Sequence, residues 1–390
     1  MAAPRPVAYA LGMSKIKDDV RLDAWPLVES LLPAGWREQA KTLGALRRVR
    51  QIRDPATLLR VLLIHLADGC SLVETAVRAA ELNLCELSDV AVLKRLRAGG
   101  EWLNWMCRGL WASRGHRLAK MDRRVRAVDS TMVVETGETG TQWRVHYSLN
   151  LSDLRCDYFE VTSADKGESL AKFPVLKGDL LVGDRGLAIA DPIGGVIARG
   201  GDVLVRASLH NLPMYSPNHE RFRPLGKLRR LRVGAPAEWP AWLRTRDGRW
   251  IVGRMIAIRR SARSAAAAQR RVNRKAQGRG TVASAQALEA ALYMTLWTSL
   301  SVTELDAAEA LRLYRQRWQI ELSFKRSKSI LGLGQLPKHS DESSRAWLHG
   351  KLLVALLVEQ LIVEADSFSP WGYPLEANAQ PMAGNRVHGT

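Results

Sequence analysis

The segment RVRAVDSTMVVET (124–136) is rich in apolar and β-branched residues, which is typical of a strand, yet it holds Asp129 in its middle. The segments WRVHYSLNL (143–151) and DYFEVTSA (157–164) follow after short connections and have a similar composition. Three such strands predict an antiparallel meander. A carboxylate placed among apolar neighbours is costly unless it is paired or bound, so Asp129 is a candidate functional residue.

The chain beyond this meander is predicted to alternate between helices and strands. We expect helices at 165–173, at 187–200 with a break near Pro192, and from Ser301 or Thr303 to Gly332; we expect strands at 178–186, 201–208 and 291–300. The strand at 178–186 ends in Asp184-Arg185-Gly186. When residues 209–287 are set aside, this order resembles the mixed α/β sheet of ribonuclease H.

The last predicted helix contains YRQRWQIELSFKRSK (314–328), with five Lys or Arg and a single acid, Glu321. At 100° per residue a polar stripe lies within about 80° on this helix, between apolar residues on both sides, so we expect its charges to be held against the protein body. The stripe consists of Tyr314, Arg317, Glu321, Lys325 and Lys328. It could form an internal ladder of salt bridges, since Arg317 and Lys325 each lie four residues from Glu321. It could instead bind a ligand.

In a ribonuclease H-like sheet the first and fourth strands are neighbours, and a helix after the last strand packs across them. Asp129, Asp184 and Glu321 would then converge, and three unpaired carboxylates at one point would repel one another. Two divalent cations remove this conflict. Mg²⁺ prefers oxygen ligands, and a pair of such ions about 3.5–4 Å apart supports phosphoryl transfer. The expected cofactor is therefore two Mg²⁺ ions, with Mn²⁺ as a substitute.

These residues resemble a known family, the DDE transposases of bacterial insertion sequences of the IS-four type. The family signature Y-x2-R-x3-E-x6-K is matched by Tyr314, Arg317, Glu321 and Lys328. The second acid lies in Asp184-Arg185-Gly186-Leu187 and the first in Asp129-Ser130-Thr131, and a long β-rich insertion precedes the glutamate. The likeness covers residues 45–370 approximately.

The resemblance implies roles for individual residues. Asp129, Asp184 and Glu321 would be the catalytic metal ligands, and Tyr314, Arg317 and Lys328 would contact DNA. We add Arg185, Arg206 and Lys325 as candidate phosphate contacts, against the alternative of surface or structural roles. Family members often stack a Trp of the insertion on a flipped base. Trp250 and Trp297 are the candidates, and core packing is the alternative for both.

Composition supports a nucleic-acid partner. The 390 residues carry a formal net charge of +19 and a sequence pI of about 10.3, although a ribosome-associated basic protein would share this excess. The Cys and His residues are scattered, which argues against a zinc or disulfide framework and for a reducing cytosol. The resemblance implies the cytoplasm of a bacterium, in association with the nucleoid. The apolar segment 348–365 contains Lys351 and Glu359, so it is not predicted to span a membrane.

The predicted organisation has a ribonuclease H-like core interrupted by an insertion. We expect a flexible arm (1–13), a helical and possibly DNA-binding region (14–122), the catalytic core (123–208 and 288–332), a β-rich basic insertion (209–287), a C-terminal helical segment (333–376) and a disordered tail (377–390). The insertion includes an acid-free stretch with eight Lys or Arg between Arg259 and Arg279.

The function expected from these features is cleavage and joining of DNA at the ends of an insertion sequence. The partners would be double-stranded DNA with terminal inverted repeats and a second copy of the chain that bridges two ends. Two alternatives stay open. The polar tail after residue 376 would fit a truncated copy that binds DNA and inhibits transposition. A structure-specific nuclease without strand transfer would use the same acids.

Overall fold

The computed structural model describes residues 25–47, 50–112, 122–135, 142–337 and 340–367. The expected arm (1–13) and tail (377–390) lie outside these residues. The centre is a sheet in the order β3-β2-β1-β4-β5-β10-β9-β6, and β11 pairs with one end of β1. The bounds are β1 Val125–Glu135, β2 Trp143–Asn150, β3 Arg155–Ser163, β4 Leu180–Gly183, β5 Asp202–Arg206, β6 Pro236–Pro240, β9 Arg254–Arg259, β10 Tyr293–Thr298 and β11 Gln335–Leu336.

Strand directions confirm the mixed α/β, ribonuclease H-like class. β1, β2 and β3 form the expected antiparallel meander, whereas β1, β4 and β5 are parallel neighbours. β10 then pairs antiparallel with β5. The first and fourth strands are therefore adjacent, as the sequence predicted, and the sheet can hold residues from both at one place.

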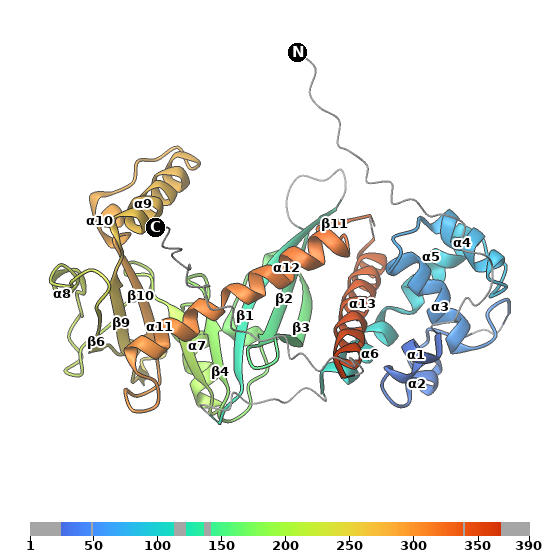
Figure 1. The fold of residues 1–390 in the computed structure, drawn as a ribbon, viewed down its shortest axis with the longest axis horizontal. Helices are drawn as coiled ribbons and strands as arrows, with labels where there is room; N and C mark the ends of the chain where they lie inside the picture. The colour runs from blue at the N-terminus through green and yellow to red at the C-terminus, as the bar shows by residue number, and fades with distance from the viewer. Residues whose placement is uncertain (1–24, 48–49, 113–121, 136–141, 338–339, 368–390) are drawn as a thin grey trace, which may run out of the picture.

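The two faces of the sheet are covered by different elements. Alternate residues of β1, β4 and β5 join two separate apolar clusters, because successive side chains of a strand point to opposite faces. One face is covered by α11 (Ala307–Gln316) and α12 (Trp318–Ile330), which run across the sheet in Figure 1, and the other by α7 (Ala190–Ala198). The helix that carries Glu321 thus lies over a defined face of the strands.

The N-terminal region is helical, as predicted. Its helices are α1 Trp25–Ser30, α2 Trp36–Thr42, α3 Pro55–Leu66, α4 Leu72–Glu81, α5 Asp89–Ala98 and α6 Gly100–Ala112. Asp54 caps α3 by accepting a hydrogen bond from the Thr57 amide, and Ser71 and Glu74 form the expected capping box of α4. The long C-terminal helix α13 (Asp341–Ser367) packs against α6, α5 and α3, so the two ends of the described chain share one core (Figure 1).

α13 has the length and apolarity of a membrane-spanning helix, but its surroundings account for this composition. Of the apolar stretch of α13, 61% is buried inside the protein. Lys351 lies in this stretch and is itself buried, with its ammonium group 5.3 Å from the centroid of the Trp347 ring. The helix is apolar because it packs against protein on several sides, and a membrane is not needed to explain it.

Three predicted helices differ from the structure. Residues 165–173 form two 3₁₀ turns, η1 (Ala164–Lys166) and η2 (Leu170–Lys172), because Gly167 lies between them with a positive φ of 61°. α7 is not broken at Pro192, since a proline is tolerated in the first turn of a helix. The last helix is entered at Asp306, whose side chain accepts a hydrogen bond from the Glu309 amide, and it divides into two helices at Arg317.

Residues 209–287 combine short strands with helices, namely β6, β7 (Leu243–Arg244), β8 (Trp250–Ile251), β9, α8 (Leu225–Leu228), α9 (Ala262–Gln277) and α10 (Ala285–Ala290). β9 pairs with β10 and β6 pairs with β9, so this region extends the central sheet at one edge. α9 and α10 stand out from that edge in Figure 1. The basic, acid-free stretch of the sequence forms α9.

Candidate active site

Two aspartates lie next to each other at the centre of the sheet. β1 and β4 pair in parallel with Val128 opposite Gly183, so the next residue on each chain is an aspartate, Asp129 on β1 and Asp184 just after β4. Asp129 and Asp184 each lie two residues after a member of the apolar cluster beneath α11 and α12, namely Ala127 and Val182. Because side chains alternate along a strand, both aspartates belong to the face that packs toward these helices. The register of the sheet therefore brings these two predicted acids together under the last helices.

Asp129 is strongly affected by its surroundings. Burial and the nearby carboxylates of Asp184 and Glu168 raise the pKa of Asp129 to about 6, while the Ser130 amide, which donates a hydrogen bond to Oδ1 over 2.8 Å, and the Arg317 guanidinium act in the opposite direction. Asp184 accepts a hydrogen bond of 2.6 Å from the Gly186 amide. The centre thus concentrates negative charge in a partly buried place.

Glu321 reaches this centre through Arg317. The Arg317 guanidinium pairs with Asp129 Oδ2 at 3.3 Å and also with Glu321. The side chain of Arg317 is only 13% exposed, whereas that of Glu321 is 58% exposed. The expectation of a whole polar stripe held against the protein body is therefore wrong for Glu321, and it is also wrong for Lys325 and Lys328, which are exposed. The Arg317–Glu321 pair of the proposed ladder is present, because the chain remains helical through the junction at Arg317.

Tyr314 and several arginines lie beside Asp184. Tyr314 is 6% exposed, and burial raises the pKa of its hydroxyl, while Arg317 and Arg206 oppose this shift. Burial, followed by repulsion from Arg206, lowers the pKa of Arg185, and the same two causes lower that of Arg260. Within the described part of the chain, Arg260 Nε is buried without a hydrogen-bond partner. The predicted residues Arg185 and Arg206 are thus joined by Arg260 in a group of mutually repelling cations.

The two candidate tryptophans are both packed. Trp297 is fully buried, donates a hydrogen bond of 2.7 Å to the Ala241 carbonyl, and belongs to the apolar cluster on the opposite face from Asp129. Core packing, the alternative to base stacking for Trp297, is therefore correct. Trp250 stacks on His219 with ring centroids 4.1 Å apart and meets Tyr215 edge to face. Stacking on a DNA base by Trp250 would have to compete with these contacts.

A fourth carboxylate, Glu168, lies in the same centre. Its Oε2 accepts a hydrogen bond of 2.9 Å from the Ser130 hydroxyl, and Arg144 Nη1 is 4.0 Å from that oxygen. Sequence patterns gave no role to Glu168, which falls in the segment that was expected to be a helix. The one sequence signal for an interrupted helix here is Gly167, because glycine readily adopts the positive φ that the chain has just before Glu168.

The donor atoms of this centre suit a hard divalent cation, because they are carboxylate oxygens. Within the residues that the structure describes, however, no group of three or more His, Cys, Asp or Glu is arranged so as to hold one ion. Arg317 explains this arrangement, since its guanidinium lies between Asp129 and Glu321. The residues fit a divalent cation by the chemistry of their donor atoms, and Arg317 now pairs with two of the three predicted ligands.

Comparison with known proteins places this chain in a family. Residues 167–357 match the family described as "Transposase DDE domain". The chain is 33% identical over 337 residues to the putative transposase InsL for insertion sequence element IS186A of Escherichia coli (strain K12), covering 85% of this chain and 91% of that protein. It is 32% identical over 338 residues to the transposase for insertion sequence element IS421 of Escherichia coli, with the same coverage. This chain therefore belongs to the DDE transposases of insertion sequences, enzymes that depend on divalent metal and act on DNA.

Proposed function

We propose that this transposase cleaves and joins DNA at the ends of its insertion sequence by two-metal phosphoryl transfer, with Asp129, Asp184 and Glu321 as the metal ligands. The observation that carries the proposal is the parallel register of β1 and β4, which sets Asp129 and Asp184 side by side beneath the helix bearing Glu321. The spacing of Tyr314, Arg317, Glu321 and Lys328 supports assignment to the IS-four type.

The three carboxylates would hold two Mg²⁺ ions, or Mn²⁺ in their place. Bound divalent ions supply charge neutralisation at the reacting phosphodiester and a more acidic water. The contribution of this chain is to keep Asp129 and Asp184 in fixed register, and to keep Glu321 on a helix that contacts β1 and β2. Arg317 holds the acids before the ions bind and is then free to contact a phosphate.

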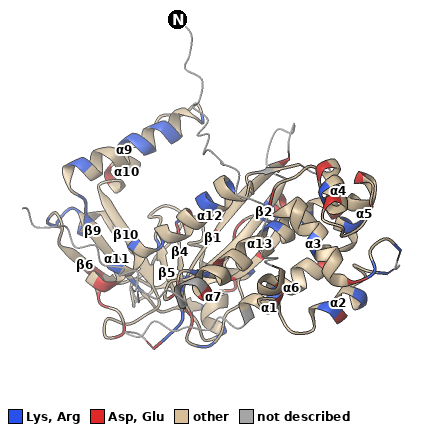
Figure 2. Ribbon diagram, turned by 45° about the vertical axis from the view of Figure 1, so that its right-hand side comes forward, with Lys and Arg blue, Asp and Glu red and all other residues tan. Residues whose placement is uncertain are grey.

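Basic side chains lie next to these acids and extend to α9, where they would contact the DNA backbone. Arg185, Arg206 and Arg260 repel one another and lie near Asp184 or Tyr314, and Arg260 is also affected by Arg271 of α9. Figure 2 shows further Lys and Arg residues along α9 and α12. Phosphate groups would relieve this repulsion, because an arginine binds phosphate well and no acid lies in the stretch that forms α9.

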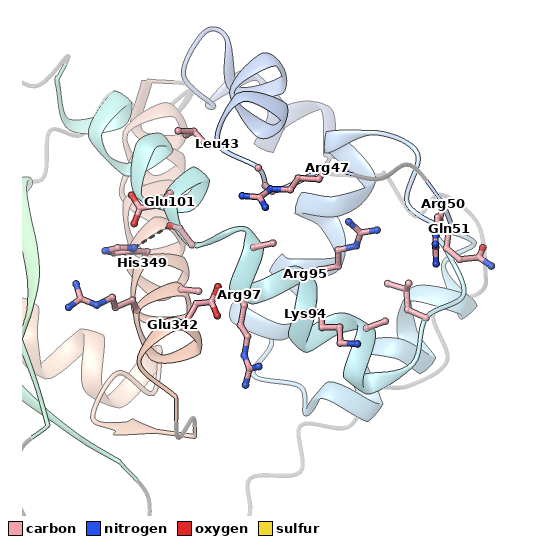
Figure 3. A pocket seen from close by; sticks show the side chains of 18 residues that line it. Leu43, Arg47, Arg50, Gln51, Lys94, Arg95, Arg97, Glu101, Glu342 and His349 are labelled. Carbon is pink, nitrogen blue, oxygen red and sulfur yellow. Dashed lines mark hydrogen bonds between the residues drawn. The ribbon is translucent and has the colours of Figure 1, made fainter.

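The helical N-terminal region offers a second contact for DNA. A cavity of about 1010 Å³ opens between α5, the segment after α2, and α13 (Figure 3). Its lining contains six cations and two acids: Arg47, Arg50, Lys94, Arg95, Arg97 and Arg345, with Glu101 and Glu342. We propose that this surface binds the DNA backbone near the terminal repeat, at a distance from the acids.

Salt dependence tests this N-terminal contact. Lys94→Ala combined with Arg97→Ala should weaken binding to an end fragment and lower the slope of log affinity against log salt by about 2, as expected for two lost phosphate contacts. The matched control is Arg78→Ala on α4, which lies outside the cavity and pairs with Asp68 at an exposed position. An unchanged slope in the double variant would remove this cavity from the DNA contacts.

The catalytic proposal is tested by strand cleavage. The substrate is a DNA fragment that carries the inverted repeats flanking the element's own coding sequence, incubated with Mg²⁺ or Mn²⁺. Asp184→Asn should abolish nicking at the repeat boundary while retaining DNA binding, because the amide keeps an acceptor for the Gly186 amide but loses the charge. Glu220→Gln, an exposed acid in the segment before α8, is the control that should cleave like wild type.

The products decide between the alternatives. Nicking followed by joining to a second DNA establishes a transposase reaction, whereas nicking without joining indicates a nuclease. Specific binding without nicking by the wild type would contradict the catalytic proposal. Two ends must be joined in one complex, so we propose a homodimer working at the bacterial nucleoid; one chain per DNA end in the cleaving complex is the expected stoichiometry.

A further inference from the structure

We propose that Glu168 is a positioning residue of the catalytic centre, which holds the two segments that carry Asp129 and Asp184 at a fixed separation. The inference rests on the proposed function, because it assigns Glu168 a part in the same reaction. It is carried by contacts that Glu168 makes on both sides, one with the residue after Asp129 and the other with the turn after Asp184.

The first contact fixes the segment of Asp129. Glu168 Oε2 accepts the Ser130 hydroxyl hydrogen at 2.9 Å. Arg144 on β2 donates to the same Ser130 hydroxyl oxygen at 3.0 Å, and its guanidinium also faces Glu168. A charge-assisted hydrogen bond of this kind is stronger than a neutral one. Ser130 is therefore held from two sides, and its amide in turn binds the Asp129 carboxylate.

The second contact fixes the turn of Asp184. A Cβ added to Gly186 would lie 2.0 Å from Glu168 Oε1 and 3.0 Å from the carboxyl carbon, so the carboxylate rests directly on this glycine. Gly186 has no positive φ that would require glycine, and its amide donates to Asp184. Glu168 Oε1 thus lies where a side chain at residue 186 would begin, and the same Cβ would be 3.2 Å from Asp184 Oδ1.

Through these two contacts Glu168 acts as a spacer between the segments that carry Asp129 and Asp184. Residues 164–172 cross from β3 toward β4 as two short 3₁₀ turns, and they deliver one carboxylate between the segments of Asp129 and Asp184. Metal ligands must be held to within about 0.5 Å for efficient catalysis, and residues that orient ligands typically change metal affinity or activity about 10–100-fold when removed. Glu168 is in the place that such a residue would occupy.

Four variants test the inference. Glu168→Ala removes both contacts, whereas Glu168→Gln keeps an oxygen that can accept the Ser130 hydroxyl. Gly186→Ala leaves the glutamate in place but displaces its carboxylate, and the fourth variant combines Glu168→Ala with Gly186→Ala. The measurements are Mn²⁺ binding to the metal-free full-length protein by titration, the Mn²⁺ concentration needed for half-maximal cleavage, and affinity for the end fragment.

We expect Glu168→Ala and Gly186→Ala each to weaken Mn²⁺ binding about 10–100-fold with DNA affinity unchanged, and Glu168→Gln to restore most of the loss. The combined variant should lose less than the product of the two single losses, because both variants act in part through the same carboxylate. Wild-type Mn²⁺ binding in Glu168→Ala would overturn the inference. So would losses that multiply in the combined variant, since Gly186→Ala would then act on Asp184 directly. An equal loss in Glu168→Gln would overturn it too, in favour of direct ligation.

Failure of the proposed function would give results that differ from failure of this inference. If the wild-type protein bound Mn²⁺ but did not cleave the end fragment, the catalytic proposal would fail, while the Mn²⁺ titrations of the four variants would still decide the role of Glu168. Thermal unfolding of each variant shows whether it is folded, and Glu168→Gln provides a measurement that does not depend on the tolerance of the fold for Glu168→Ala.

Discussion

Replacing Arg317 by methionine tests the electrostatics of the centre without any need for DNA. Methionine keeps most of the apolar stem of the side chain and removes its charge. Arg317 is 13% exposed and is paired with both Asp129 and Glu321, so the variant leaves Asp129 with its acidic neighbours and no cation in contact. The metal-free protein should therefore become less stable.

The size of the effect follows from the geometry. Two unit charges at the 3.3 Å that separates Arg317 from Asp129 attract by about 5 kcal/mol at an effective dielectric constant of 20. Desolvation of the buried guanidinium offsets much of this attraction. The pair with Glu321 adds less than about 1 kcal/mol, because that carboxylate is mostly exposed to solvent. The expected net loss is about 1.5–3 kcal/mol, the usual value of a hydrogen bond to a charged group.

The assay is urea unfolding of wild type and Arg317→Met at pH 7.5, first with a chelator and then with Mn²⁺. A cation bound between Asp129 and Asp184 would take over the neutralising role of Arg317, so Mn²⁺ should stabilise the variant more than the wild type and narrow the difference. Arg315→Met, at an exposed position on α11, is the control and should change neither value. A difference that stays the same with Mn²⁺ would refute the idea that Arg317 and the metal share one site.

Three further predictions concern the fold. Arg126→Met should cost about 3–5 kcal/mol of unfolding free energy, because Arg126 is fully buried and its loss leaves the buried carboxylates of Asp157 and Asp179 with less compensation; urea unfolding measures this. Trp297→Ala should cost about 3–5 kcal/mol in the same assay by leaving a cavity, and equal stability would contradict its buried position. The contribution of His349 to stability should be lost as pH drops from about 6.5 to 4, because burial lowers the pKa of His349 to about 4 and the unfolded chain takes up the proton first. His349→Gln should therefore lose less stability than wild type between these pH values, as a pH–stability curve would show.

The strands could be predicted well because they carry strong local signals. β1, β2 and β3 are rich in β-branched and aromatic residues and are separated by turns, and their bounds match the prediction to within two residues. The helix signals at Asp54 and Ser71 were equally reliable, since an N-cap side chain and its target amide are close in sequence. Local sequence determines the bounds of these strands and the starts of these helices, and tertiary packing is consistent with both.

The sequence was less informative wherever packing overrides local preference. Residues 164–172 have a composition suited to a helix, yet they form two 3₁₀ turns that reach the catalytic centre through Glu168. Helical periodicity alone also could not show which face of α12 meets solvent. Glu321 is exposed on α12, although the same pattern predicted a stripe held against the protein.

The single glutamate on the basic helix can be understood from the charges that surround it. Asp129, Asp184 and Glu168 lie near one another at this centre, and Glu321 is linked to it through Arg317, which pairs with both Asp129 and Glu321. Burial is the main cause of the raised pKa of Asp129, and the nearby carboxylates of Asp184 and Glu168 raise it further. A helix with more acids at this position would add repulsion, whereas one without any would leave Arg317 only Asp129 to pair with. One glutamate, exposed and held by Arg317, can leave that pair at small cost when a divalent ion competes for it.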